Sequence, residues 1–132
     1  MKYHIYTKEK GLIETDDITN EIKRLIWHRE DGPAAIRYYE NGQRSHEAWF
    51  LNDKRHREDE PAVIKYYENG QRSHEAWFLN DKLHREDGPA EIGYNKENGQ
   101  KSYETWFLNG KRYSFEDWNK SKQLRKAKLK LI

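Results

Sequence analysis

Residues 28–55 read HREDGPAAIRYYENGQRSHEAWFLNDKR, and residues 56–83 repeat this 28-residue unit almost letter for letter. The two copies differ only at the pairs Gly32/Glu60, Ala35/Val63, Arg37/Lys65 and Arg55/Leu83. Residues 84–112 are a looser third copy with one extra residue near Lys96. A fixed period of this length is the signature of a repeat architecture. Because one copy is too small to bury a core alone, the copies are expected to stack on one another.

The repeats divide the chain into three parts, namely residues 1–27, the repeats themselves (28–55, 56–83 and 84–112), and a basic tail over residues 113–132. In the first part, Tyr3–Thr7 and Leu12–Thr15 predict an opening hairpin. Residues 16–27 have apolar residues at helical spacing, and Thr15 or Asp16 could cap a helix there. The end of that segment must feed the first repeat, so we favour a strand at its end. In the tail, Ser114 followed by Asp117 resembles a capping box and predicts a helix.

Every repeat contains two turn signals. Asn41-Gly42, with its copies Asn69-Gly70 and Asn98-Gly99, is the strongest short-range hairpin signal and predicts a type I′ turn. The second signal is Asn52-Asp53, with Asn80-Asp81 and Asn109-Gly110 as its copies. In the first repeat the strands are then expected at Ala34–Tyr39, Arg44–Leu51 and Lys54–His56.

A two-residue turn at Asn41-Gly42 fixes the hairpin register, since it pairs Tyr39 with Arg44 and, further out, Ala34 with Trp49. Directly opposed residues share a face of the sheet. One face is expected to hold Ala34, Ile36, Tyr38, Ser45, Glu47 and Trp49, and the other Ala35, Arg37, Tyr39, Arg44, His46, Ala48 and Phe50. The first set changes least in the third copy, so we assign it to the core. We expect Trp49, Trp77 and Trp106 to point inward, and the phenylalanines that follow them to point the other way.

These elements predict an all-β fold, an elongated antiparallel meander of stacked 28-residue β-hairpin repeats with a short C-terminal helix. About nine to eleven short strands are expected, and the helix would cover the last open strand edge. The hydrophobic fraction is only 34%, but five Trp, nine Tyr and four Phe supply a thin aromatic core. The chain has no Cys, which fits a reducing cytoplasm, and no apolar run long enough to span a membrane.

No residue pattern predicts catalysis, a metal or another cofactor. The recurring His28, His56 and His84 invite a metal site, but three strands per repeat would separate them by roughly 14 Å. We therefore interpret each as a histidine that packs on tryptophan and is hydrogen-bonded within its loop. The Arg-Glu-Asp loops offer three equivalent sites, whereas an enzyme needs one asymmetric pocket. They are interpreted as loops in which Arg pairs with a carboxylate.

The second face mixes cations with aromatic rings, a composition typical of protein interfaces and also suited to single-stranded nucleic acid. The expected partner-binding residues are Arg37, Tyr39, Arg44, His46, Phe50, Lys65, Tyr67, Arg72, His74, Phe78, Tyr103 and Phe107. Ordinary cross-strand pairing explains the same residues without any partner. The tail has a net charge of +4 and residues 1–112 a net charge of −2, which counts against a phosphate-dominated partner.

The sequence therefore predicts a non-enzymatic module that binds another protein, with a homodimer over the same face as one form of it. An RNA- or single-stranded-DNA-binding module that uses this face and the basic tail is the alternative. The tail is interpreted as the solvated side of a terminal helix in preference to a membrane-surface handle.

Two motifs carry a family resemblance. Tyr38-Tyr39-Glu40-Asn41-Gly42-Gln43 and Trp106-Phe107-Leu108-Asn109-Gly110-Lys111 resemble the hairpins of MORN-variant repeats. The segments 28–34, 56–62 and 84–90 resemble a bacterial and phage tandem-repeat family built on His-Arg-Glu-Asp-Gly-Pro-Ala. The resemblance covers about residues 27–112. It implies stacked antiparallel hairpins that act as an interaction module. It further implies an inhibitor of antitoxin or phage anti-defence (anti-CRISPR) type, whose partner would be a nuclease or a nucleoprotein effector.

Overall fold

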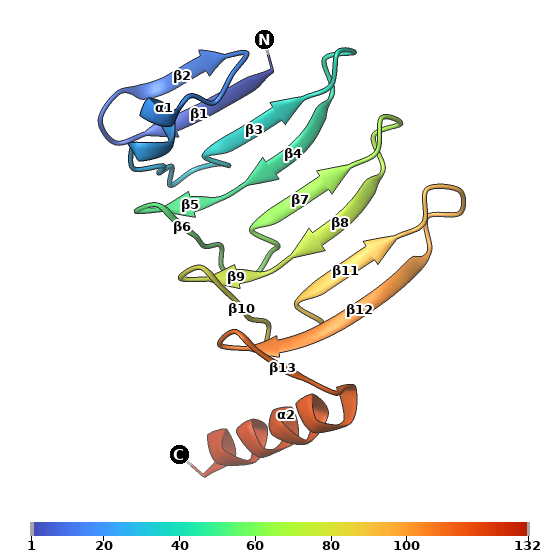
Figure 1. Ribbon diagram of the computed structural model, residues 1–132. Coiled ribbons are helices and arrows are strands. Elements are labelled where there is room, and N and C mark those ends of the chain that lie inside the picture. Colours follow the sequence, from blue (N-terminus) through green and yellow to red (C-terminus); the bar gives the residue numbers. More distant parts are fainter. Residues whose placement is uncertain (1, 132) are drawn as a thin grey trace.

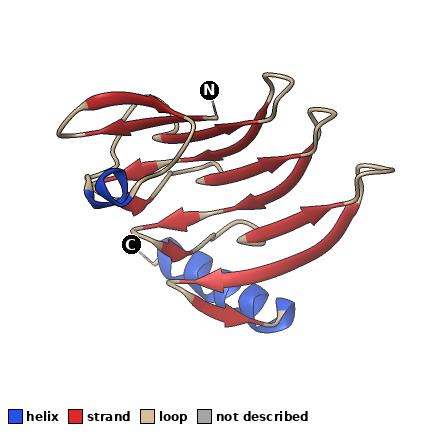
Figure 2. Cartoon of the chain, turned by 45° about the horizontal axis from the view of Figure 1, so that its top comes forward, coloured by secondary structure: helices blue, strands red, loops and turns tan. Residues whose placement is uncertain are grey.

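The computed structural model describes residues 2–131 and consists mainly of a nine-stranded antiparallel sheet (Figure 1). Figure 2 shows that strands outweigh helices in the fold. The strands are β1 (Tyr3–Thr7), β2 (Gly11–Thr15), β3 (Ala35–Tyr38), β4 (Arg44–Ala48), β5 (Phe50–Leu51), β6 (Lys54–Arg55), β7 (Val63–Tyr66), β8 (Arg72–Ala76), β9 (Phe78–Leu79), β10 (Lys82–Leu83), β11 (Glu91–Tyr94), β12 (Lys101–Leu108) and β13 (Lys111–Tyr113). The helices are α1 (Asn20–Arg24) and α2 (Phe115–Lys130). The predicted all-β meander with a short C-terminal helix is confirmed.

The first two repeats each add two strands to the main sheet and the third adds three, which gives the order β13-β12-β11-β8-β7-β4-β3-β1-β2. In the first two repeats the third expected strand lies outside this sheet, because β5–β6 and β9–β10 form separate two-stranded sheets, whereas β13 of the third repeat pairs with β12. One repeat therefore advances the sheet by about 9.6 Å, since neighbouring strands lie about 4.8 Å apart. The expected advance of three strands and 14 Å was wrong.

The second turn signal adopts the positive-φ geometry that its residues tolerate, whereas the first does not form the expected type I′ turn. Positive φ angles at both Asn52 (49°) and Asp53 (67°) place the type I′ turn at the second signal. At the first signal only Gly42 has a positive φ, of 84°, and the Gly42 N–H donates to the Tyr39 carbonyl. This is a three-residue loop, a type I turn followed by a left-handed glycine. In this loop Glu40 and Asn41 keep negative φ angles and only a glycine takes the left-handed conformation, so no non-glycine residue is strained.

The longer loop is compensated by an irregularity in the strand pair. The register shifts between Arg37 and Tyr38, so Tyr38 lies opposite Arg44 while Arg37 lies opposite His46 as expected. The extra residue, Ser45, forms a β-bulge and is buried. On the bulged strand, the side chain of Arg44 between the bulge and the turn changes face as a result, whereas Tyr38 on the partner strand does not. The face predicted for Arg44 was therefore wrong, and the same shift in the second repeat moves Arg72.

The buried residues confirm the core assignment for the Ile face. Equivalent positions of the three repeats are nearly inaccessible, namely Ala34, Ala62 and Ala90 and also Ile36, Ile64 and Ile92. Trp77 is buried, and Trp49 and Trp106 are partly buried. The expectation that the phenylalanines face solvent was wrong for Phe78, which is 8% exposed and packs in a cluster with Ala62 and Ala76. Trp49 and Leu83 pack against this cluster, and Arg55 lies 4.1 Å from the centre of the Phe78 ring.

The His-Arg-Glu-Asp-Gly-Pro loops hold the repeats together through their arginines. Arg57 lies 3.9 Å from the centre of the Trp49 ring, and Arg85 lies 3.8 Å from that of Trp77. Arg29 stacks in the same way on Tyr6 of the opening hairpin. The same guanidinium groups pair with loop carboxylates, as the sequence predicted. Each arginine thus connects its own loop to the preceding repeat or, for Arg29, to the opening hairpin.

The residue before the proline, which is Gly32, Glu60 or Gly88 in the three repeats, lies against this arginine side chain. A Cβ built on Gly32 would lie only 2.6 Å from the Arg29 guanidinium carbon. In the middle repeat Arg57 instead donates to Glu60 at 2.5 Å, and the left-handed residue of the loop is Asp59, with φ 66°. As expected, the residue before the proline needs no positive φ.

The two ends of the sheet differ. After the predicted opening hairpin, Thr19 caps the five-residue helix α1, and Trp27 then forms a single bridge with Thr7. The strand favoured at the end of residues 16–27 is reduced to this bridge. At the other end Ser114 caps α2 and accepts the Asp117 N–H at 3.1 Å, as predicted. Among the described residues, no helix is long and apolar enough to span a membrane.

Candidate protein-binding surface

The antiparallel register places one row of side chains straight across the sheet. Tyr3 lies opposite Arg37, Arg37 opposite His46, His46 opposite Lys65, and Lys65 opposite His74. The row continues through Gly93 to Tyr103. Because directly opposed residues share a face, all of these side chains lie on one side of the sheet. We call Arg37, His46, Lys65 and His74 the basic row, and their side of the sheet the basic face.

The basic row is accessible. Arg37 and Lys65 are exposed, and His46 and His74 are partly exposed. Tyr103 closes the row and is 46% exposed. Its ring lies over Gly93, where an added Cβ would come within 2.0 Å of it. Gly93 stands where the first two repeats carry Arg37 and Lys65, so the third repeat replaces a cation with an exposed ring.

A row of small residues runs beside the basic row on the same face. It consists of Ala35, Ala48, Val63 and Ala76, followed by Glu91. Glu91 is the one acidic residue in these two rows, and its carboxylate lies 3.3 Å from His74 Nε2. Within residues 2–131 neither Arg37, which lies 5.8 Å from the centre of the Tyr3 ring, nor Lys65 forms an ion pair. The basic face therefore combines two permanent cations with a neighbouring row of short, partly apolar side chains.

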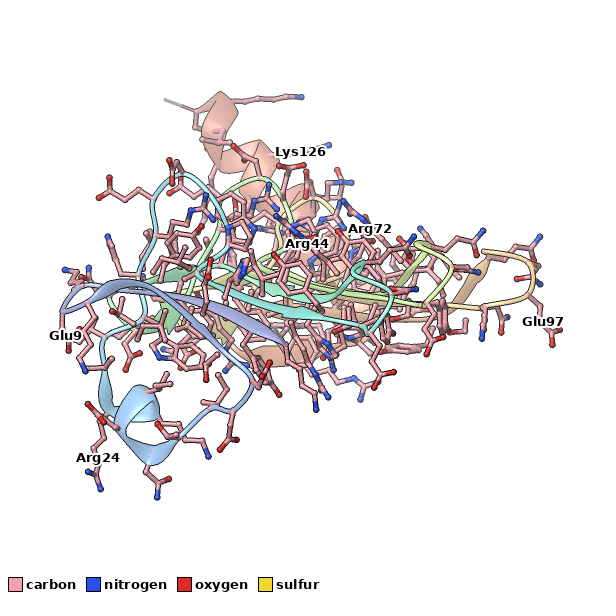
Figure 3. All side chains as sticks on the ribbon, turned by 90° about the horizontal axis from the view of Figure 1, so that it is seen from above. Glu9, Arg24, Arg44, Arg72, Glu97 and Lys126 are labelled. Carbon is pink, nitrogen blue, oxygen red and sulfur yellow. The ribbon has the colours of Figure 1, made fainter. Side chains whose placement is uncertain are left out.

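The opposite side of the sheet, which we call the glutamate face, has its charges paired. Its central row reads His4, Ile36, Glu47, Ile64, Glu75, Ile92 and Glu104 across the strands. Arg44 donates to Glu47 at 2.9 Å, and Arg72 donates to Glu75. Tyr66 and Tyr94, each from the following repeat, donate to the same two carboxylates. Figure 3 shows Arg44 and Arg72 on the side of the sheet where α2 lies, whereas α1 lies on the other side.

The two tyrosines of this network predict a response to alkaline pH. Burial, followed by the bond to Glu47 or Glu75, raises the pKa of Tyr66 and of Tyr94 from 10 to about 12. Since the unfolded chain loses these protons first, their stabilising contribution is present below pH 10 and is lost as the pH rises towards 12. In a 295-nm absorbance titration we expect Tyr66→Phe to remove a late-titrating tyrosine. Removal of one that ionises near pH 10 would contradict the assignment.

His46 predicts a response to acid. Burial lowers its pKa below the ordinary 6.5, and the flanking Lys65 and Arg37 lower the pKa further. The unfolded chain therefore takes up this proton first, so the contribution of His46 to stability falls as the pH drops below about 6.5. Histidine C–H shifts followed by NMR are expected to give His46 a pKa below 6.5, and denaturation of His46→Gln is expected to lose less stability between pH 7.5 and 5.5 than the wild type. A His46 pKa above 6.5 would contradict the described position between two cations.

The structure distributes the sequence-predicted partner residues over four environments. The basic face brings together Arg37, His46, Lys65, His74 and Tyr103. On the glutamate face, Arg44 and Arg72 form ion pairs with Glu47 and Glu75. Tyr39 and Tyr67 connect repeats, since their hydroxyls donate to the Tyr66 and Tyr94 carbonyls at 2.6 and 2.7 Å. Phe50 and Phe107 are partly buried, as is Trp27, which contacts Phe50 edge-on. Sequence reasoning missed Tyr3, although the β1 strand pattern was the signal that could place it.

The recurring histidines act as hydrogen-bond acceptors. His28, His56 and His84 each accept a backbone N–H through Nδ1 at 2.9 Å, from Asn52, Asn80 and Asn109 respectively. A hydrogen bond within the histidine's own loop was expected. The observed bond instead reaches the type I′ turn of the same repeat. No cluster that could hold a metal ion occurs within residues 2–131.

Comparisons of the chain with protein-family models, with curated proteins and with solved structures give no match.

Proposed function

We propose that this protein is a non-enzymatic module that binds an acidic surface of another protein through its basic face. The observation that carries the proposal is the contrast between the two faces. Arginines on the glutamate face are paired with Glu47 and Glu75, whereas Arg37 and Lys65 stand exposed in a row with partly exposed histidines. Exposed cations beside aromatic and small apolar side chains are typical of interfaces.

The inhibitor or antitoxin function implied by the family resemblance is a finer version of the same proposal. In that version the partner is a nuclease or nucleoprotein effector, and the row of repeats covers an acidic region of it. An anti-CRISPR protein would act in this way. The array offers such a blocker a continuous sheet with an accessible basic face.

Nucleic acid fits the basic face less well because the permanent cations are sparse. Arg37 and Lys65 are separated by about 9.6 Å, two strand spacings. One strand of DNA carries one charge per about 3.4 Å along the helix axis, so this interval spans about three phosphates. A groove that tracks a nucleic-acid backbone needs more cations than this.

Charge reversal at Lys65 tests the proposal. The wild-type chain is used to capture its partner from the source cell, and the purified partner is then titrated with Lys65→Glu. We expect affinity to fall by about tenfold or more, roughly 1.4 kcal/mol. The matched control is Lys120→Glu, which makes the same charge change on an exposed position of α2 and is expected to bind normally.

Two results would overturn the proposal. Equal affinity of Lys65→Glu and the wild type would remove the basic face from the interface. Capture of an oligonucleotide in place of a protein, with affinity that falls steeply as salt rises, would establish the nucleic-acid alternative. A homodimer over this face would appear as a mass change on dilution in light scattering.

A further inference from the structure

We infer that the segment recognised by the basic face is an acidic α-helix that lies across the strands, with acidic residues seven positions apart. The inference rests on the proposed function and specifies the partner of that surface. It follows from three features of the face, namely the spacing of its cations, the height of the neighbouring row and the position of the open end.

The spacing of the cations selects the secondary structure of the partner. Arg37 and Lys65 are two strands apart, and so are His46 and His74, which gives about 9.6 Å for each pair. Seven residues of an α-helix rise about 10.5 Å and return to nearly the same side of the helix. An extended strand covers a similar distance in three residues, but residues three apart point to opposite sides. A helix can therefore meet both cations, and a single strand cannot.

The neighbouring row determines how closely the helix can approach. Ala35, Ala48 and Val63 lie beside the basic row and are only partly buried. Their short side chains leave the exposed side chains of Arg37 and Lys65 standing above a low strip. A helix laid along this strip would bury small apolar side chains beneath it and keep its carboxylates beside the cations.

The ends of the basic face limit the length of the contact. α1 lies on this side of the sheet, and its residue Glu21 is tied to Lys10 of the opening hairpin at 2.9 Å (Figure 3). At the other end, Tyr103 offers an exposed ring where the first two repeats carry histidine. The footprint from Arg37 to Tyr103 spans five strand spacings, or about 24 Å. This length accommodates about 16 helical residues, or a little over four turns.

Two designed peptides of equal composition and net charge test the inference. Both are alanine-rich 21-residue helices, one with glutamates seven positions apart and one with the same glutamates five positions apart, which places them on different sides of the helix. Fluorescence anisotropy with the full chain is expected to give at least fivefold tighter binding for the seven-residue spacing. In amide NMR spectra, shifts are expected at Arg37, Lys65 and Val63. A third peptide with a central proline is expected to bind as weakly as the five-residue spacing.

The variants separate the two proposals. Lys65→Glu is expected to abolish the preference for the seven-residue spacing, whereas Lys120→Glu is expected to retain it. Equal binding of the spacings, or no binding of either peptide, would overturn the helical inference. If Lys65→Glu still weakens the captured partner in that case, the proposed function stands. If Lys65→Glu leaves the captured partner unaffected, the proposed function fails with it.

Discussion

Trp118→Ala is expected to detach α2 from the sheet and to lower the free energy of unfolding by about 3–5 kcal/mol. Trp118 is the buried residue of α2, at 3% exposure, and its indole N–H donates to the Arg85 carbonyl at 3.1 Å. The rest of the helix has no continuous apolar stripe. A 16-residue helix is marginal in water on its own, so loss of the anchor should unfold it.

Circular dichroism and urea denaturation measure this effect, because the helical signal should fall together with the unfolding midpoint. Leu124→Ala is the matched control, since Leu124 lies in the same helix but is 66% exposed. Its unfolding free energy is expected to change by less than about 0.5 kcal/mol. Equal effects of the two substitutions would show that Trp118 does not anchor the helix.

Glu75→Ala is expected to be the most damaging charge deletion, at about 2–3 kcal/mol. Glu75 is 7% exposed and accepts hydrogen bonds from Arg72 in its own repeat and from Tyr94 in the next. Its removal leaves the Tyr94 hydroxyl without this acceptor and loses a contact between repeats. The partial exposure of Arg72 keeps the cost below that of a fully buried ion pair.

Glu104 provides the matched control at the same position of the third repeat. Its ion pair is with Lys101 at 3.5 Å, and its side chain is 32% exposed. No later repeat supplies a tyrosine there, because α2 follows. Glu104→Ala is expected to cost less than about 1 kcal/mol in the same denaturation experiment. A cost for Glu104→Ala as large as that for Glu75→Ala would exclude the tyrosine bridge as the source of stability.

The repeat period made most of the fold predictable. It predicted the hairpins and the buried Ile positions. The start of α2 lies outside the repeats and was predicted from Ser114 and Asp117. The turn conformation was not predictable, because Asn-Gly serves both a two-residue type I′ turn and a three-residue loop that ends in a left-handed glycine. In this sheet the loop is one residue longer than expected, and the extra residue Ser45 in the bulge restores the expected register beyond it. The predicted pairing of Arg37 with His46 was therefore right, although the turn was wrong.

The same compensation explains which surface residues were misplaced. Arg44 lies between the turn and the bulge, so it points to the glutamate face, whereas His46 lies beyond the bulge and keeps its predicted side. Phe78 was misplaced for another reason. Alternation along one strand predicts its direction but not the contacts with Trp49 and Arg55 of the preceding repeat that cover it. Burial of this kind depends on contacts between repeats, which the strand pattern does not contain.

Amine-reactive labelling of the complex, analysed by mass spectrometry at each lysine, tests the central claim most directly. The claim is that the partner covers the basic face. Lys65 reports on this face because it is the lysine among the four residues of the basic row. Lys65 is expected to be labelled in the free chain and protected in the complex, while Lys120 and Lys126 on α2 keep their reactivity. A complex in which Lys65 stays fully reactive and the lysines of α2 become protected would contradict the account.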